Sequence, residues 1–184
     1  MKEEQKNQEQ EFPEENFVEE DLLIEIFAKD KKINTSNFSC GVESLDNYAK
    51  TLLSQDVKRG LAVCYVFQTD GQLSGFYTLS SAQIDASDYL KIKKGVGSRL
   101  PIPVILIGRF AIDGAQQGKG CGGILLLDAI RRAIETSKAV ASKAIIVDPI
   151  NEAASSFYEK FGFMKIPDTN KMMLTMEEGA MLIG

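Results

Sequence analysis

A run of glycines between an apolar stretch and an amphipathic helix pattern is the feature that most constrains the fold. The run reads Gly118-Lys119-Gly120-Cys121-Gly122-Gly123, after a β-rich segment at residues 104–112. The residues that follow repeat apolar side chains at helical spacing. A strand, a glycine loop and a helix in this order direct several backbone N–H groups at one spot, and the helix N-terminus adds partial positive charge there. The loop is therefore predicted to bind an anion.

Three other functions are compatible with a loop rich in glycine. Gly118-x-Gly120-x-x-Gly123 matches the dinucleotide fingerprint, but four predicted strands precede it and no acidic residue follows at the expected distance within a βαβ repeat. The chain lacks GxxxxGK[ST], which excludes a P-loop. A plain tight turn remains an alternative, because glycine serves turns through its freedom in φ.

The remaining pattern predicts an alternation of strands and helices around this loop. Asp70-Gly71 is a strong hairpin signal between two β-rich runs. Strands are predicted at residues 22–29, 61–68, 72–80, 104–112, 143–147, 163–166 and 171–176. Helices are predicted at residues 42–58, 87–92 and 151–161 and after the glycine loop.

Composition points to one folded domain with an acidic extension. The 184 residues are 44% hydrophobic, enough for one core. Residues 1–20 are rich in Glu and Gln and poor in apolar side chains, so we expect a disordered acidic tail there and a single domain over residues 21–184. No apolar run approaches the roughly 18 residues that span a bilayer, and the N-terminus lacks a signal-peptide pattern, so a cytoplasmic protein without a membrane partner is expected.

The absence of histidine narrows the chemistry. The chain has none, which excludes Ser/His and Cys/His nucleophiles, a histidine base and a histidine-ligated metal. No metal site is expected. The three cysteines, Cys40, Cys64 and Cys121, are odd in number and widely spaced, and are interpreted as buried thiols.

The loop and a second motif together resemble the GNAT superfamily of acyltransferases. Gln117-x-x-Gly120-x-Gly122 is similar to its pyrophosphate loop, and the segment from Asn151 through Phe157-Tyr158 to Gly162-Phe163 is similar to its second signature. The resemblance implies acetyl-CoA as cofactor and an α/β (α+β) fold. The expected fold is a mixed, mostly antiparallel sheet of six to seven strands with about four helices, splayed between the fourth and fifth strands. It also implies a set of cofactor-binding residues: Phe110, Ala111, Ile112, Gln117, Gly118, Lys119, Gly120, Cys121, Gly122, Asn151, Ser155 and Tyr158.

Further motifs resemble one branch of this superfamily. They lie at residues 38–48, 75–80 and 101–113, including Gly108-Arg109-Phe110-Ala111-Ile112-Asp113. The branch comprises toxins of type II toxin–antitoxin modules, which acetylate the α-amino group of aminoacyl-tRNA and are neutralised by a ribbon-helix-helix antitoxin. The resemblance implies charged tRNA, such an antitoxin and a homodimer as partners. The overall acidity departs from the branch. An acetyltransferase of a small amine or protein N-terminus, and a non-catalytic acyl-CoA-binding protein, are the alternatives.

Tyr158 is the expected general acid, because a phenol of pKa near ~10 is a proton donor matched to an alkyl thiolate. Its alternative role is aromatic packing beside Phe157. The base is open: Asp113 is interpreted either as a proton relay or as a structural cap. An α-amino group, with a pKa near ~8, needs little help to lose its proton, which favours an aminoacyl ester over a lysine as acceptor.

A phosphate-contacting surface for tRNA is expected from bases before and within strand 104–112. These candidates are Lys91, Lys93, Lys94, Arg99 and Arg109. Arg131 and Arg132 could extend this surface, but they follow the apolar stripe of a helix and are interpreted as solvent-facing charges.

Overall fold

A twisted seven-stranded sheet forms the centre of the molecule in the computed structural model, which describes residues 23–28, 33–94 and 101–184. The strand order is β1-β2-β3-β4-β5-β7-β6, and every neighbouring pair is antiparallel except β4 and β5. The predicted mixed, mostly antiparallel α/β sheet is thus confirmed. The strands are β1 (Glu25–Ile26), β2 (Val63–Thr69), β3 (Gln72–Ile84), β4 (Ile102–Ile112), β5 (Ala144–Val147), β6 (Met164–Lys165) and β7 (Met172–Thr175).

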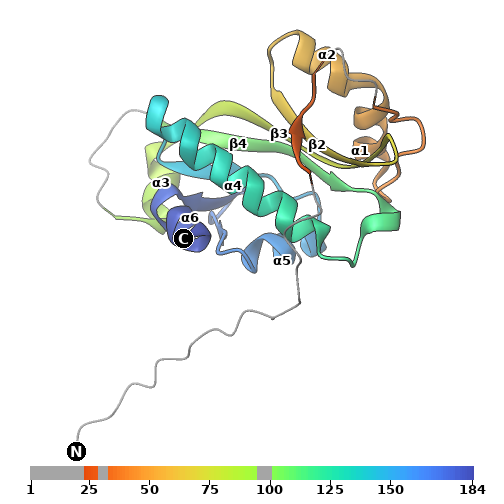
Figure 1. Cartoon of the computed structure of the whole chain (residues 1–184). Helices are drawn as coiled ribbons and strands as arrows, with labels where there is room; N and C mark the ends of the chain where they lie inside the picture. Colours follow the sequence, from red (N-terminus) through yellow and green to blue (C-terminus); the bar gives the residue numbers. More distant parts are fainter. Residues whose placement is uncertain (1–22, 29–32, 95–100) are drawn as a thin grey trace, which may run out of the picture.

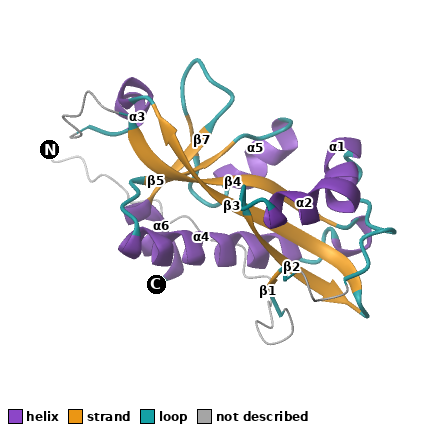
Figure 2. Ribbon diagram, turned by 90° about the horizontal axis from the view of Figure 1, so that it is seen from above, coloured by secondary structure: helices purple, strands orange, loops and turns teal. Residues whose placement is uncertain are grey.

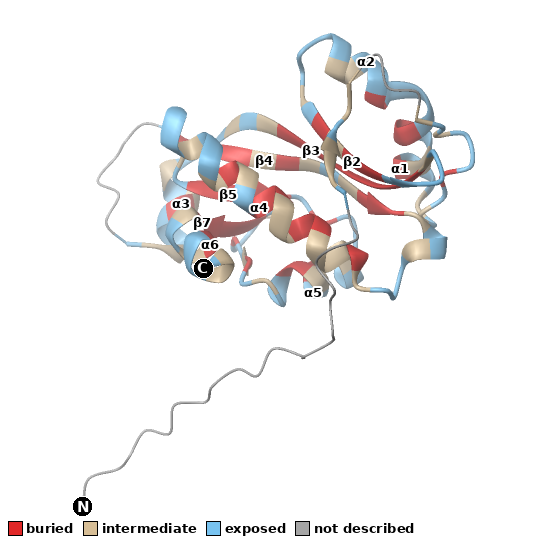
Figure 3. Cartoon of the chain, in the orientation of Figure 1, coloured by how far each residue is buried: buried red, intermediate tan, exposed pale blue. Residues whose placement is uncertain are grey.

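Helices cover both faces of this sheet (Figure 1, Figure 2). The long helix α4 packs on one face, in a core cluster that also holds side chains of α5, and α1 and α2 pack on the other face in a separate cluster. Figure 3 shows the buried residues concentrated along the central strands and on the inner side of α4. The helical elements are α1 (Glu43–Asn47), the π-helical turn η1 (Tyr48–Leu52), α2 (Leu53–Lys58), α3 (Ala86–Ile92), the 3-10 turn η2 (Gly114–Gln116), α4 (Cys121–Ala139), α5 (Glu152–Glu159) and α6 (Met176–Ile183).

The β2–β3 hairpin turns at the predicted dipeptide. Asp70 and Gly71 have φ angles of 51° and 74°. Two successive positive φ values suit the right-handed twist of a two-residue hairpin. The hairpin leads into β3, whose pairing with β4 is broken once by a register shift between Tyr77 and Leu79.

The sheet opens between β4 and β5, as predicted. Their parallel pairing runs from Val104 opposite Ala144 to Ile107 opposite Val147, while β4 continues to Ile112. After Val147 the chain reads Asp148-Pro149, and a proline has no N–H with which to extend a ladder. The second half of β4 therefore pairs with β3 on one side only.

Several boundaries differ from the sequence-based expectation. The first strand is only Glu25–Ile26, although residues 22–29 were predicted, and residue 22 and residue 29 lie outside the described residues. The helix predicted at 42–58 is interrupted by the π turn η1. Helix α6 was not predicted, although Thr175 and Glu178 form a reciprocal capping box at its start. The expected acidic tail, residues 1–20, also lies outside the described residues. No helix in the described ranges has the length and apolarity to cross a membrane.

Candidate active site

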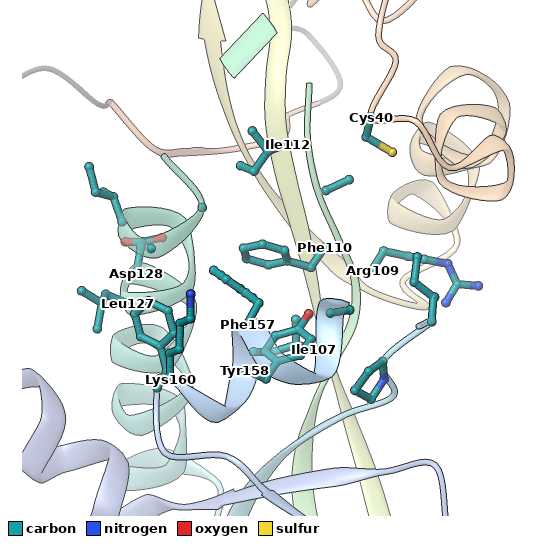
Figure 4. Close-up of a pocket in the computed structure, with 18 of the residues that line it drawn as sticks. Cys40, Ile107, Arg109, Phe110, Ile112, Leu127, Asp128, Phe157, Tyr158 and Lys160 are labelled. Carbon is teal, nitrogen blue, oxygen red and sulfur yellow. The ribbon is translucent and has the colours of Figure 1, made fainter. Parts of the chain in front are cut away.

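A large open cleft of about 2250 Å³ lies where β4 separates from β5 (Figure 4). Its walls come from the glycine loop and α4, the second half of β4, α5, residues 40–52 and α6. The cleft brings together most of the predicted cofactor-binding residues. These are Phe110, Ala111, Ile112, Gln117, Gly118, Gly120, Gly122, Asn151 and Tyr158.

The glycine loop presents backbone donors at the start of α4. Gly118 and Gly120 have φ angles of 72° and 79°, a backbone region that side chains other than glycine rarely adopt. The first backbone hydrogen bond of the helix runs from Gly123 N–H to Gly120 C=O. Within the described ranges, no N–H group of residues 118–122 donates to another protein atom. A row of unused donors at a helix N-terminus fits an anionic phosphate group.

Two predicted loop residues contribute backbone rather than side chain to this row. The Lys119 ammonium lies 3.4 Å from the Gln116 side-chain oxygen, on the exposed surface. Cys121 is the first residue of α4, and its side chain is buried in the core. Neither lines the cleft with its side chain.

The side chain of Gln117 is turned toward two carbonyl groups of the protein. Its Nε2 donates to the C=O of Cys40 and to the C=O of Ile112, each at 2.9 Å. Ile112 is one of the predicted cofactor-binding residues. Its carbonyl is engaged by Gln117, so its N–H is the group left for that purpose.

The register of β4 aims alternate backbone groups into the opening. Asp113 N–H donates to Ser74 C=O in β3 at 2.9 Å. Because backbone groups alternate in direction along a strand, Phe110 and Ile112 turn theirs away from β3 and toward the gap. Arg109 N–H donates to the Thr78 hydroxyl at 2.9 Å, at the register shift.

Tyr158 lies on α5 among aromatic rings. Its ring centroid is 6.1 Å from that of Phe110, 5.4 Å from that of Phe157 and 5.4 Å from that of Phe163. Only 7% of the Tyr158 surface is exposed, yet the residue lines the cleft. Figure 4 shows it beside Phe157 and next to β4. Burial raises the pKa of the Tyr158 phenol. The phenol is therefore neutral at physiological pH and able to donate a proton.

Asn151 and Ser155 begin helix α5. The Asn151 side chain accepts a hydrogen bond from Ala154 N–H at 2.8 Å and so caps the helix. Asn151 lines the cleft, whereas Ser155 is buried and donates its hydroxyl to the Asn151 carbonyl at 3.3 Å. Both residues thus orient the helix that carries Tyr158.

Asp113 has the contacts expected of a structural cap. One carboxylate oxygen accepts from Ala115 N–H at 2.9 Å, and the other accepts from Ser39 N–H at 3.0 Å. Both oxygens hold the backbone, and the first caps the turn η2. Asp113 is a structural cap.

The predicted basic residues are scattered. Lys91 pairs with Asp88 and Asp168, and Lys93 pairs with Glu178 of α6. Arg109 is exposed, lines the cleft and has its guanidinium carbon 5.2 Å from the centre of the Tyr48 ring. Lys94 is exposed at the end of a described segment, and Arg99 lies outside the described residues.

The two arginines of α4 differ from each other. Arg131 is exposed and lines the cleft. Arg132 is held by Asp128 at 2.8 Å and has its guanidinium carbon 4.2 Å from the centre of the Tyr65 ring, so it is a structural charge.

Sequence reasoning missed part of the cleft. Cys40 was expected to be buried, but it is half-buried and lines the cleft. Tyr48 also lines it. Their shared segment, residues 38–48, carried a family-like motif that could have suggested a role. Met181 and Leu182 of α6 also line the cleft. They are not among the predicted site residues, since that helix was not predicted.

The sheet is open beside a phosphate cradle, formed by the unused N–H groups of residues 118–122 at the start of α4. A buried phenol lies on the next helix, α5. This combination defines an acyltransferase of the GNAT type. Residues 60–165 match the acetyltransferase (GNAT) domain family, which covers more than half of the chain. The chain belongs to the GNAT acetyltransferase family.

Two groups of relatives share most of the length. The chain is 34% identical over 153 residues to a tRNA-acetylating toxin of Mycobacterium tuberculosis (strain ATCC 25618 / H37Rv), covering 82% of this chain and 91% of that protein. It is similar to a mutant of the toxin AtaT bound to the C-terminus of the antitoxin AtaR and to acetyl-CoA, with 27% identity, a TM-score of 0.74 and coverage of 88% and 97%. It is also similar to AtaT complexed with acetyl-methionyl-tRNAfMet, with 27% identity, a TM-score of 0.76 and coverage of 89% and 100%.

Proposed function

We propose that this chain transfers the acetyl group of acetyl-CoA to the α-amino group of aminoacyl-tRNA, and so acts as a translation-inhibiting toxin. The observation that carries the proposal is the near full-length similarity to a tRNA-acetylating toxin, at 34% identity. The cleft supports the proposal independently, because it combines a phosphate cradle, a strand with one unpaired edge and a protonated phenol. The AtaT complexes with acetyl-CoA and with acetyl-methionyl-tRNAfMet support the same substrates.

The unused N–H groups of residues 118–122 would hold the pyrophosphate of acetyl-CoA, since they form a donor row at a helix N-terminus. The backbone groups of Phe110 and the N–H of Ile112 would bind the pantetheine arm along the opening. When bound, acetyl-CoA supplies an activated thioester acyl group. Backbone donors aimed at its carbonyl oxygen would stabilise the negative charge that develops there.

Tyr158 would protonate the thiolate as it leaves. Its raised pKa keeps the proton on the phenol at neutral pH, and its position in the cleft wall exposes it to the reaction. Both carboxylate oxygens of Asp113 accept backbone N–H groups, which supports a mechanism without a carboxylate base at this position. An α-amino group with a pKa near ~8 supplies enough neutral amine without a strong base.

Among the described basic residues predicted to contact tRNA, Arg109 is the one that lines the cleft. It is exposed, whereas Lys91 and Lys93 are paired with carboxylates. Its packing over Tyr48 holds the guanidinium near the opening, where it would contact a phosphate of the tRNA acceptor end.

A toxin of this kind needs a neutralising partner. We propose a ribbon-helix-helix antitoxin, supported by the antitoxin-bound AtaT structure, together with a homodimer in solution. Because charged tRNA is the acceptor, the protein would act in the cytoplasm.

The test is to incubate the purified chain with acetyl-labelled acetyl-CoA and aminoacylated tRNA. Label should appear on the amino acid and be released with it by mild alkaline hydrolysis of the ester. Uncharged tRNA is the control and should stay unlabelled. Acetylation of a free amine or peptide N-terminus without labelling of charged tRNA would contradict the proposed acceptor. Cofactor binding without turnover on any amine would contradict the enzymatic role.

A further inference from the structure

The start of the glycine loop is fastened to a segment far away in sequence. Gln117 Nε2 donates to Cys40 C=O at 2.9 Å, across 77 residues. Ser39 N–H donates to the Asp113 carboxylate at 3.0 Å, and Gly114 N–H donates to Ser39 C=O at 2.8 Å. Three hydrogen bonds therefore join residues 39–40 to the turn that leads into the phosphate cradle.

The same segment is fastened on its other side to helix α1. Asp46 accepts from Cys40 N–H at 2.7 Å and from the Ser39 hydroxyl at 3.0 Å. Burial by itself would raise the pKa of the Asp46 carboxyl, but these hydrogen bonds outweigh it and the pKa is lowered. Helix α1 continues into η1, where Tyr48 packs under Arg109. The chain of contacts thus links the cofactor loop to the acceptor side of the cleft.

Both hydrogens of the Gln117 side-chain amide are used by this arrangement. A primary amide nitrogen has two hydrogens, and here one goes to Cys40 C=O and the other to Ile112 C=O. Both partners only accept, so the nitrogen and not the oxygen must face them. The donors of Gln117 are therefore not available to a phosphate, whereas the N–H groups of residues 118–122 are.

We propose that Gln117 is a positioning residue. Its side chain pins the loop to Cys40 and Ile112 so that the following N–H groups converge on the pyrophosphate, and Asp46 holds the Cys40 anchor in place. The inference rests on acetyl-CoA as the cofactor of the proposed function, and is independent of which amine accepts the acetyl group. It predicts that a change at Asp46, outside the loop, weakens cofactor binding.

The first experiment measures the Kd of acetyl-CoA by titration calorimetry, without any acceptor. Gln117→Leu removes both donors and should raise the Kd about tenfold, whereas Gln117→Arg keeps donors for both carbonyls and should stay within about twofold of the original protein. Gln116→Leu is the matched control on the neighbouring residue and should leave the Kd unchanged. Equal Kd values for Gln117→Leu and the original protein, or equal losses in the Leu and Arg variants, would overturn the proposal.

A double-mutant cycle separates anchoring from direct contact. Asp46→Ala should raise the Kd of acetyl-CoA about threefold to fivefold, and Asp46→Ala combined with Gln117→Leu should bind within about twofold of Gln117→Leu alone. Independent effects would instead multiply, which would refute the link through Cys40.

A truncated donor distinguishes positioning from general destabilisation. Acetyl-pantetheine lacks the pyrophosphate, so kcat/KM with this donor and any accepted amine should be the same for Gln117→Leu and the original protein. Equal losses with both donors, accompanied by a lower Tm, would assign Gln117 a merely structural role. Failure of tRNA acetylation with an intact Kd pattern would reject the proposed acceptor and leave this inference standing.

Discussion

The rings of Phe110 and Tyr158 meet edge to face, with their centroids 6.1 Å apart, across the opening between β4 and α5. This contact ties the proposed acid to the strand whose backbone groups face the cleft. Among the described residues, no protein group accepts a hydrogen bond from the Tyr158 hydroxyl. The phenol is therefore held by its ring and keeps its proton available to the cleft.

Replacing Tyr158 with Phe should separate chemistry from packing. The ring contacts remain, so Tm and the Kd of acetyl-CoA should change little, while kcat should fall about 100-fold or more with loss of the acid. Tyr89→Phe is the matched control, because Tyr89 is buried in a different core cluster. A Tyr158→Phe variant with unchanged kcat would assign the residue to packing.

The pH dependence follows from the raised pKa of Tyr158. Burial stabilises the neutral phenol, so this group should stay protonated throughout the range from pH 7 to pH ~10. The kcat should therefore show no alkaline decline in that range. Because the folded-state pKa lies above the unfolded value of ~10, the linked stability is fully present below pH ~10 and is lost as the pH rises above it. An alkaline limb near pH 8 that disappears in Tyr158→Phe would contradict this.

Asp113→Ala should lower stability without removing a catalytic base. Losing the two hydrogen bonds from Ala115 N–H and Ser39 N–H should cost about 1–2 kcal/mol in the free energy of unfolding. At saturating acetyl-CoA, kcat and its pH profile should be preserved. A kcat loss of about 100-fold with an altered acidic limb would instead make Asp113 the base.

Arg109→Ala and Lys93→Ala form a matched pair for acceptor binding. Removing Arg109 should raise KM for charged tRNA and reduce the slope of log KM against log salt by about one unit. Lys93 is paired with Glu178, so its removal should leave that slope nearly unchanged. The measurement is initial rates at several salt concentrations, and equal slopes for the two variants would contradict the assignment.

Features with a local cause could be predicted from the sequence. The Asp70-Gly71 turn needs only two residues with positive φ. The glycine run directly precedes the helical pattern, so it predicts where α4 begins. Contacts between distant segments could not be predicted. The bond from Gln117 to Cys40 spans 77 residues and depends on how α1 packs on the sheet. The second hydrogen bond of Asp113 depends on Ser39, a residue distant in sequence that lies beside it in the fold.

The C-terminal helix shows a different limit. Its capping box, Thr175 with Glu178, is a local signal. The β-rich residues before it, however, predicted a strand at residues 171–176, and no element was predicted after it. The boundary between β7 and α6 lies at Met176, inside the last predicted strand. Thr175 is both the last residue of β7 and the N-cap of α6.

The early end of the β4–β5 ladder at Ile107 and Val147 gives this sheet an edge in its interior. Edges recruit extended chains that complete the hydrogen bonding. The pantetheine arm of acetyl-CoA contains amide groups, so it can pair with this edge as a short strand would. Cofactor binding would then extend the sheet. Amide hydrogens of Phe110 and Ile112 should then exchange with solvent much more slowly once acetyl-CoA is bound, as if the protein had gained a strand.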